Sequence, residues 1–280
     1  MLTLLAEYGD EAKVLAGGQS LVPLLNLRLA RPSVVVDLGA VDGLARQERV
    51  DGRLLLGPMT RQRAVETSPD VAAACPLLVE AIRHIGHVQI RHRGTVGGSL
   101  AHADPAAEFP AVALALDAEM VARSTRGERV VAAQDFFDGP FTTTLQPDEL
   151  LVEVRVPVTE GRCQMAFLEQ ARRTGDFAVA GVAAVVRFEP GSTRVAAAGL
   201  AALGVGPTPI RLRDAEAAVL GSELDDAAVA AAAAAAAAAV SPFTDLHADA
   251  DYRRYLVGVL VSRALRSGPG SGGQGGADDA

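Results

Sequence analysis

The sequence predicts a protein of mixed helices and strands that is divided into more than one compact unit. A chain of 280 residues is long enough for two or three such units. Its content of 49% hydrophobic and 21% charged residues is that of a globular protein able to bury a sizeable core. Short β-branched or alternating runs are interspersed with stretches that carry helix start and stop signals, which predicts both kinds of element.

The first sixty residues are expected to form a small α/β unit. The stretch LTLLAEYGDEA is helix-like, and the following KVLAGG predicts a short strand that runs into a glycine turn. Because valine is β-branched, the run VVV predicts a buried strand over residues 32–39. A third strand is predicted over residues 53–60. Short turns separate the three strands, so we expect them to lie close together.

The middle of the chain alternates between predicted helices and strands. Helices are predicted over Thr60–Glu66, with the threonine as cap, and over Pro76–Gly86. The dipeptide Asp104–Pro105 is expected to open another helix, with aspartate at the N-cap and proline at the first helical position. A hairpin is predicted around residues 125–127, and an alternating strand follows over residues 149–158.

The last part of the chain is predicted to form a separate unit that begins near residues 159–162. Strands are expected over residues 163–173, 180–190 and 193–204, and helices over residues 211–221 and 251–266. The alanine run 230–239 also predicts a plain helix, because alanine has the highest helix propensity and acidic residues precede the run.

The balance of charge disfavours several classes of partner. The formal net charge is -8 and the isoelectric point is about 5.2, whereas nucleic acids and anionic membranes bind basic faces. Apart from the alanine run, no apolar stretch approaches the length of a membrane span, and the N-terminus lacks the pattern of a signal peptide. We therefore expect the chain in the cytoplasm.

Metal-binding and hydrolytic patterns are not found. Cys75 and Cys163 form no C-x-x-C motif, which favours free thiols over a disulfide, and they are too few to ligate an iron–sulfur cluster. No Ser-His-Asp, Cys-His or paired-carboxylate set is evident, so we predict no catalytic residue. Four histidines lie close in sequence without a carboxylate or thiol at ligand spacing, so we predict no metal site: His84, His87, His92 and His102.

Two glycine pairs carry the strongest functional signal. They lie in LAGGQSLVPLLNLRLARP and in RGTVGGSLAHADPAAEFP, and each has hydroxyl residues nearby. Backbone amides without a Cβ beside them can approach an anion closely, so two such loops could hold one pyrophosphate from two sides. Neither segment is a P-loop or a Rossmann G-x-G-x-x-G motif. Arg91 and Arg93 either lie in solvent or offset the charge of the diphosphate.

These two segments resemble the flavin-binding segments of the FAD-carrying medium subunit of molybdenum hydroxylases. That family includes carbon monoxide dehydrogenase medium chains and the FAD subunits of bacterial xanthine dehydrogenases. Three further stretches resemble the same family, namely FFDGPFTTTLQPDELLVEVRVP, RRTGDFAVAGVAA and DLHADADYRRYLVGVLVSRAL. The resemblance covers nearly the whole chain, to about Leu265.

The resemblance implies an α+β fold in which two subdomains hold FAD and an α+β C-terminal domain follows. The FAD-binding part belongs to the wider group that resembles p-cresol methylhydroxylase and vanillyl-alcohol oxidase. The implied divisions are a first subdomain at residues 1–59, a second at 60–160, the C-terminal domain at 161–266 and a flexible tail at 267–280. Family members usually carry an additional strand before this start, so Met1 is expected to fall inside a helix, next to an unpaired sheet edge.

The resemblance also implies the residues that contact noncovalently bound FAD. Glu108 stands where the family usually has aspartate and would contact the adenosine part. The stretch around Leu150 and Leu151 and the residue Glu169 align with further contacts, and Phe177 matches a position beside the isoalloxazine ring. The two pyrophosphate segments would be formed by Ala16, Gly17, Gly18, Gln19 and Ser20, and by Thr95, Val96, Gly97, Gly98 and Ser99.

The function implied is that of an electron-transfer flavoprotein subunit. It would take electrons from an iron–sulfur partner and pass them through FAD to an external acceptor. Molybdopterin and [2Fe–2S] clusters would lie on separate large and small subunits, in a dimer of heterotrimers. Two alternatives stay open from the residues: a self-contained FAD-dependent oxidase or reductase, and a non-catalytic nucleotide-binding module.

Overall fold

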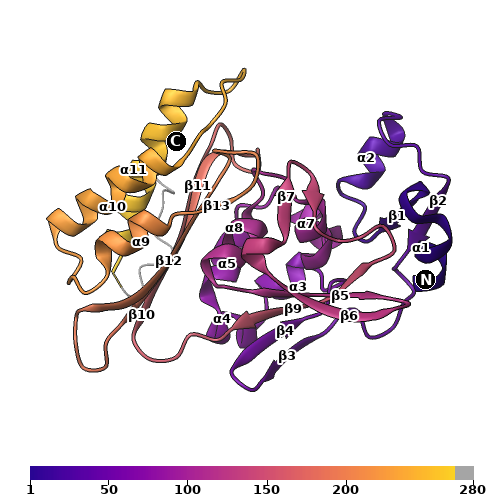
Figure 1. Ribbon diagram of the computed structural model, residues 1–280, viewed down its shortest axis with the longest axis horizontal. Helices are drawn as coiled ribbons and strands as arrows, with labels where there is room; N and C mark the ends of the chain where they lie inside the picture. Colours follow the sequence, from indigo (N-terminus) through magenta and orange to yellow (C-terminus); the bar gives the residue numbers. More distant parts are fainter. Residues whose placement is uncertain (269–280) are drawn as a thin grey trace.

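The computed structural model describes residues 1–268, and Figure 1 shows three parts that follow one another along the long axis of the molecule. The N-terminal part holds α1 (Leu2–Tyr8), the short 3-10 helix η1 (Gly9–Glu11), β1 (Ala12–Leu15), α2 (Leu21–Asn26) and β2 (Val34–Asp37). Strands β1 and β2 pair in parallel, so both run into their glycine-containing turns at the same edge. Helix α2 buries no residue and projects from this end of the molecule (Figure 1).

A five-stranded antiparallel sheet forms the base of the central part, in the order β3-β4-β9-β5-β6. The predicted strand after residue 53 is β4, which belongs to this sheet and not beside β1 and β2. The expectation that the first three strands lie together was wrong, because the hydrogen-bond partner of β4 is contributed from far along the chain. The strands are β3 (Gln47–Val50), β4 (Arg53–Leu56), β5 (Glu119–Ser124), β6 (Gly127–Ala132) and β9 (Leu150–Pro157).

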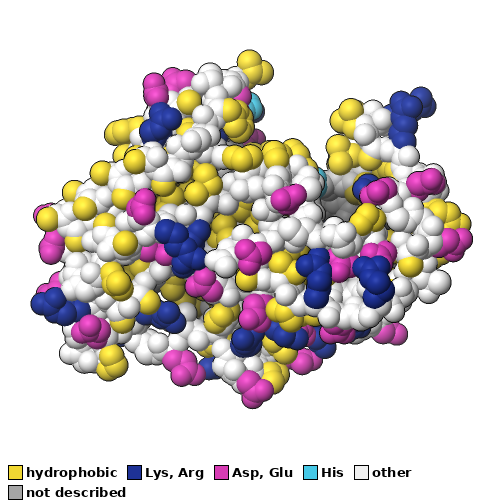
Figure 2. All heavy atoms as spheres, viewed as in Figure 1, with side chains coloured by type: hydrophobic (Ala, Val, Ile, Leu, Met, Phe, Trp, Pro, Cys, Tyr) yellow, Lys and Arg dark blue, Asp and Glu magenta, His cyan; other side chains and the backbone are white. Residues whose placement is uncertain are grey.

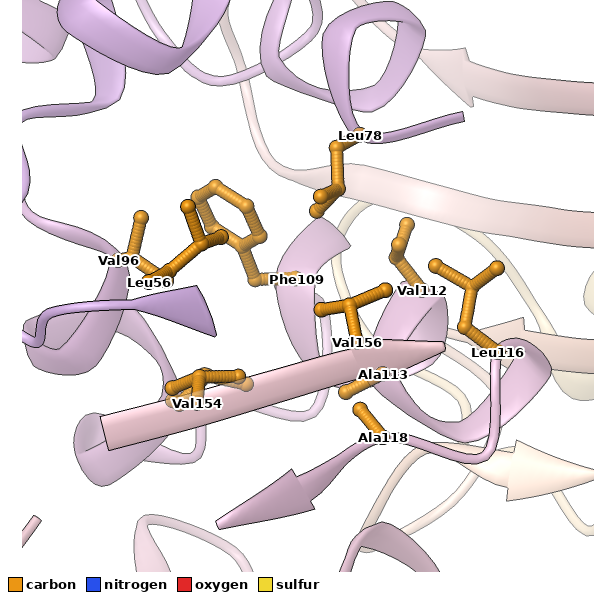
Figure 3. A pocket seen from close by; sticks show the side chains of 11 residues that line it. Leu56, Leu78, Val96, Phe109, Val112, Ala113, Leu116, Ala118, Val154 and Val156 are labelled. Atoms are coloured by element: carbon orange, nitrogen blue, oxygen red, sulfur yellow. The ribbon is translucent and has the colours of Figure 1, made fainter. Parts of the chain in front are cut away.

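Helices cover one face of this sheet and provide most of the central core. Figure 3 shows Leu78 and Phe109 from two helices lying above Val154 and Val156 of β9, around a void of about 10 Å³. A void of this size is a packing gap and holds at most one water molecule. The helices are α3 (Gln62–Glu66), α4 (Pro69–Ala74), α5 (Pro76–Ile82), α6 (Val88–Arg93), α7 (Val96–His102) and α8 (Glu108–Ala115).

The ends of two predicted helices differ from expectation. Arg61, not Thr60, is the N-cap of α3, because the Thr60 hydroxyl donates to the carbonyl of Arg46 at 2.9 Å. Asp104 does not cap α8, which begins at Glu108. Instead its Oδ1 accepts from the amide of Ala106 at 2.9 Å, forming a turn before the helix. Beside this turn lie η2 (Ala133–Asp135), β7 (Phe137–Gly139) and β8 (Thr142–Thr143).

The C-terminal part is an antiparallel sheet in the order β10-β11-β12-β13, covered on one face by three helices. Its other face packs on α5 and α8, so this sheet shares a core with the central part (Figure 1). Asp225 caps the predicted alanine helix by accepting from the amide of Ala228 at 2.9 Å. The elements are β10 (Cys163–Ala171), β11 (Ala178–Phe188), β12 (Val195–Leu203), β13 (Ile210–Arg211), α9 (Arg213–Val219), α10 (Asp226–Ala239) and α11 (Ala250–Arg266).

Two further expectations concern the C-terminal tail and membrane-spanning segments. Most of the predicted tail, residues 269–280, lies outside the described residues. Across residues 1–268, no helix combines the length and the hydropathy needed to cross a membrane.

Candidate functional site

The fold brings the two glycine segments into direct contact. A Cβ added at Gly17 would overlap the carbonyl of Arg93, and one added at Gly98 would lie 3.5 Å from the Cβ of Ala16. Glycine is therefore required at position 17 by the close approach of a second stretch of backbone. The prediction that both segments contribute to one site has a structural basis in this contact.

The first segment presents a row of free backbone donors. It follows β1 and leads into α2, and Gly18 adopts a φ of +75°, a conformation that favours glycine. Within residues 1–268, the amide N–H groups of Gly17, Gly18, Gln19 and Ser20 have no protein acceptor. The Gln19 side chain folds back and donates to the carbonyl of Gly17 at 3.2 Å. Successive free amides of this kind form a concave site for an anion.

The second segment differs from the expected bare turn. Thr95 caps α7, because its Oγ1 accepts from the amide of Gly98 at 3.0 Å. The amide of Val96 donates to the carbonyl of Thr60 at 3.0 Å, and that of Gly97 donates to the carbonyl of Pro58 at 2.9 Å. These amides are already satisfied, and a Cβ at Gly97 would overlap Pro58. This segment therefore supports the first one instead of offering a second row of free donors.

A cavity of about 430 Å³ lies beside the first segment. Figure 2 shows the surface hollowed between the α2 end of the molecule and its middle. Two guanidinium groups line the cavity, and Arg61 also donates to the carbonyl of Arg93. The lining residues are Leu15, Ala16, Gly17, Gly18, Gln19, Val22, Asp37, Gly39, Arg61 and Arg93.

The structure separates the roles of two neighbouring arginines. Arg93 lines the cavity, whereas Arg91 forms a two-point ion pair with Glu66, with N–O distances of 3.0 and 3.2 Å. Arg91 also donates to the carbonyls of Ile85 and Gly86. Its guanidinium group therefore stabilises the chain between α5 and α6. Its hydrogen bonds to Glu66 help to lower the pKa of that carboxyl against the effect of burial.

Sequence reasoning missed two charged residues of the cavity, Asp37 and Arg61, and the neighbouring Gly39. Asp37 ends β2, and its Oδ1 accepts from the amide of Gly39 at 2.8 Å. The stretch DLG directly after the valine run was a usable signal, since parallel strands deliver their carboxyl ends to one edge. The strand itself is not buried as predicted, because Val35 is 41% exposed in this two-stranded sheet. No local sequence pattern indicated Arg61. It is brought to the cavity by an isolated β-bridge to Thr95, which lies far from it in the sequence.

A second group of predicted residues lies between the central and C-terminal parts. Glu108 begins α8 and Glu169 lies near the end of β10, and their carboxyl groups influence each other electrostatically. Burial raises the pKa of Glu108 to about 7 and that of Glu169 to about 8. Phe177 lies at the same end of the β10–β11 hairpin and is 73% exposed.

Leu150 and Leu151 lie at the start of β9 and are both buried in hydrophobic clusters. Leu150 belongs to the cluster of the N-terminal part, with Leu5 and Met59, whereas Leu151 belongs to the larger central core.

The surroundings of the cysteines and of two histidines indicate structural roles. Burial raises the pKa of the Cys75 thiol to about 12, so this thiol is unreactive at neutral pH, and both cysteines are free. The ring of His84 lies against Phe167 and that of His102 against Phe141, each with centroids 5.2 Å apart. In the described part of the chain, no three His, Cys, Asp or Glu residues lie together as a metal site would require.

Comparison with known proteins decides which family the site belongs to. Residues 1–159 match the family model described as the FAD binding domain in molybdopterin dehydrogenase. The chain belongs to this flavoprotein family. Residues 165–267 of this flavoprotein match the CO dehydrogenase flavoprotein C-terminal domain.

Characterised relatives cover nearly all of the flavoprotein. It is 44% identical to the 6-hydroxypseudooxynicotine dehydrogenase complex subunit alpha of Paenarthrobacter nicotinovorans, over 94% of this chain and 89% of the relative. It is 38% identical to the carbon monoxide dehydrogenase medium chain of Hydrogenophaga pseudoflava, over 95% of this chain and 92% of the relative. A carbon monoxide dehydrogenase structure from Hydrogenophaga pseudoflava superimposes with a TM-score of 0.92 at 40% identity, covering 94% and 91% of the two chains.

Proposed function

We propose that this flavoprotein binds FAD noncovalently with its diphosphate in the cavity beside Gly17–Ser20, and works as the electron-transfer subunit of a molybdenum hydroxylase. The observation that carries the placement is the row of free amides, which faces a cavity lined by Arg61 and Arg93. Amide donors and guanidinium groups are the groups that bind a diphosphate. When bound, FAD supplies the capacity to accept electrons and pass them on.

The residues present fit FAD in three respects. The first glycine segment leaves a cradle next to backbone, which side chains at Gly17 and Gly18 would disturb. Asp37 offers a carboxylate able to accept hydrogen bonds from ribose hydroxyls at the edge of that cradle. One oxygen of Glu169 is buried without a hydrogen-bond partner in the described residues, so a ligand donor or acceptor is needed there.

The remaining residues are assigned as follows. Ala16 to Ser20 bind the diphosphate, and Thr95 to Ser99 position that segment through the contact between Gly98 and Ala16. Leu150 and Leu151 support the wall near the N-terminal part, where the adenosine half would lie. Phe177 is exposed and available to cover the isoalloxazine ring. The flavin-binding parts then form the two-subdomain arrangement of the p-cresol methylhydroxylase group, divided at residues 59 and 160.

The partners are proposed from the family. A large molybdopterin subunit would oxidise the substrate, and a small iron–sulfur subunit would relay electrons to the flavin, in a dimer of heterotrimers in the cytoplasm. Relatives are named for different substrates, including nicotine, caffeine and carbon monoxide, although they share 38% or more identity with this chain. A flavin subunit that serves such different complexes does not choose the substrate.

The test is isolation of the tagged chain, alone and from its native host. The chain alone is expected to be yellow, to release FAD on acid treatment and to oxidise no substrate. The complex from the host is expected to contain molybdenum and iron and to reduce the flavin when substrate is added. Substrate-dependent flavin reduction by the chain alone would favour a self-contained oxidase or reductase. A folded, colourless chain that takes up no FAD would favour a non-catalytic module.

A further inference from the structure

A pair of carboxyl groups occupies the seam between the central and C-terminal parts. Glu169 alternates along β10 with Phe167, whose side chain packs in the core shared with α5 and α8, so Glu169 faces the central part. Glu108 begins α8, which packs on β11 and β12 (Figure 1). The turn before α8 is fastened to the sheet by a hydrogen bond of 2.8 Å from the amide of Gly204 to the carbonyl of Pro105.

Neither carboxyl group has a partner that would stabilise a negative charge. Glu108 is 8% exposed, and its side chain makes no hydrogen bond or ion pair to another residue in 1–268. Glu169 has one oxygen that is buried without a partner, and it takes part in no ion pair within the same residues. Buried polar groups in a folded protein are normally paired, so this seam is incomplete without a further group.

None of the titratable groups on the neighbouring elements forms an ion pair with Glu108 or Glu169 in the described residues. Asp104 precedes α8 and raises the pKa of Glu108 further, while His102 of α7 and His84, which follows α5, have pKa values lowered by burial. On α5, Glu80 accepts from the amide of Phe167 at 3.2 Å. On α11, Arg253 donates to Val179, Gly204 and Asp245 on the far side of the sheet, and Arg172 after β10 contacts His247.

Two carboxylates without a cation cannot both ionise in a buried site at neutral pH, so the pair keeps a proton. Burial is the main cause of the raised pKa values, and the mutual repulsion adds to it for Glu169. A protonated carboxyl is a hydrogen-bond donor as well as an acceptor. The pair would repel the phosphates of FAD, which the arginine-lined cavity suits instead. The chain runs from the first place to the second through α7, a helix about 10 Å long, and the turn before α8.

We propose that the Glu108 and Glu169 pair retains one proton and that one of these carboxyl groups donates a hydrogen bond to a neutral polar atom of the ribityl–isoalloxazine half of FAD. This inference rests on the proposed function. It moves Glu108 from the adenosine half, where the resemblance put it, to the flavin half, because the fold sets it beside Glu169. It also makes FAD affinity depend on pH, since the donor exists only while the pair holds its proton.

The experiment measures the affinity of the full-length apo-protein for FAD from pH 5.5 to 9.5, by quenching of flavin fluorescence. The wild-type affinity is expected to be highest at low pH and to fall by about tenfold as the pH rises through 7–8, when the donor is lost. The substitution Glu169→Gln supplies a permanent amide donor, so its affinity is expected to stay near the low-pH value throughout. Glu80→Gln changes a half-buried carboxyl of the same seam, so it is the matched control and should keep the wild-type profile.

A second readout does not depend on the cofactor. The raised pKa values mean that the folded apo-protein holds protons that the unfolded chain has lost, so its stability falls as the pH rises from about 4.5 to 8. Glu169→Gln is therefore expected to raise the melting temperature of the apo-protein at pH 9 more than at pH 5. Tight FAD binding with a flat wild-type profile would overturn this inference alone, whereas no FAD binding at any pH would overturn the proposed function.

Discussion

At the scale of residues, the glycines of the candidate site have different tasks. Gly18 has a positive φ and lies among the free amides. Gly97, in the first turn of α7, packs closely against Pro58. A branched side chain at Gly97 would disturb packing before it affected any ligand. Substitution at Gly18 is therefore the better test of the anion site.

Gly18→Ala is expected to lower FAD affinity by about tenfold or more, because alanine disfavours the conformation that aims the amides. It should also lower the free energy of unfolding by about 1–2 kcal/mol. Gly221→Ala is the matched control, since Gly221 has a φ of +74° with open space around it. Titration with FAD and urea unfolding measure both effects. Equal FAD affinity in the two variants would contradict the role of the first segment.

Arg93→Gln is expected to weaken FAD binding by about tenfold, because a charge-assisted contact to the diphosphate is lost. Binding by the variant should also depend less on salt concentration than binding by the wild type. Arg187→Gln, at an exposed arginine of β11 in the C-terminal part, is the control and should change neither quantity. If Arg93→Gln binds FAD with the affinity of the wild type at both low and high salt, its side chain does not meet the phosphates.

At the scale of elements, a buried arginine ties α11 to the C-terminal sheet. Arg253 is 3% exposed and donates to the carbonyls of Val179 and Gly204, at 2.6 and 2.9 Å, and to Asp245 at 2.7 Å. The two carbonyls lie at the edge where β11 begins and β12 ends. Hydrophobic packing orients α11, and this side chain satisfies polar groups that the helix would otherwise bury.

Arg253→Met is expected to lower the free energy of unfolding by about 3–5 kcal/mol, because buried carbonyls and a carboxylate lose their partner. Arg254→Met on the next residue is the control, since Arg254 pairs with the exposed Asp251 and should stay within about 0.5 kcal/mol of the wild type. Urea unfolding followed by circular dichroism compares the two. Similar losses in both variants would contradict the specific role of Arg253.

At the scale of the whole molecule, the central and C-terminal parts share one hydrophobic core. Phe167 of β10, Leu77 of α5 and Leu203 of β12 belong to the same buried cluster. The amide of Phe167 also donates to Glu80 across the seam. Because this core is shared, the two parts are expected to open together.

Phe167→Ala is expected to cost about 3–5 kcal/mol of stability. Hydrogen exchange followed by mass spectrometry should show lower protection in both α8 and β11, because each contributes residues to the same buried cluster as Phe167. Leu246→Ala is the control, since Leu246 is 98% exposed. Loss of protection in β11 alone would mean that the two parts unfold independently.

Elements whose signals are local could be predicted from the sequence alone. Valine runs, alternation and capping residues predicted β2, β9, the β5–β6 hairpin and the alanine helix α10, because these depend on side chains within one segment. The glycine pairs likewise predicted that two distant segments serve one site, and the structure brings these segments into contact. Several short helices, among them α2, α4 and α6, were not predicted, since six-residue helices carry too few turns for a periodic pattern.

The tertiary structure decided which segments meet. Strand β4 joined β9 because antiparallel pairing brings together residues that are far apart in sequence, and no local pattern encodes that partner. The same is true of the site: Arg61 and Arg93 could not be placed at the cavity, nor Glu108 beside Glu169, until α7 and β10 had positions in space. Burial, which raises the pKa of both carboxyls, is a property of that packing and not of either residue alone.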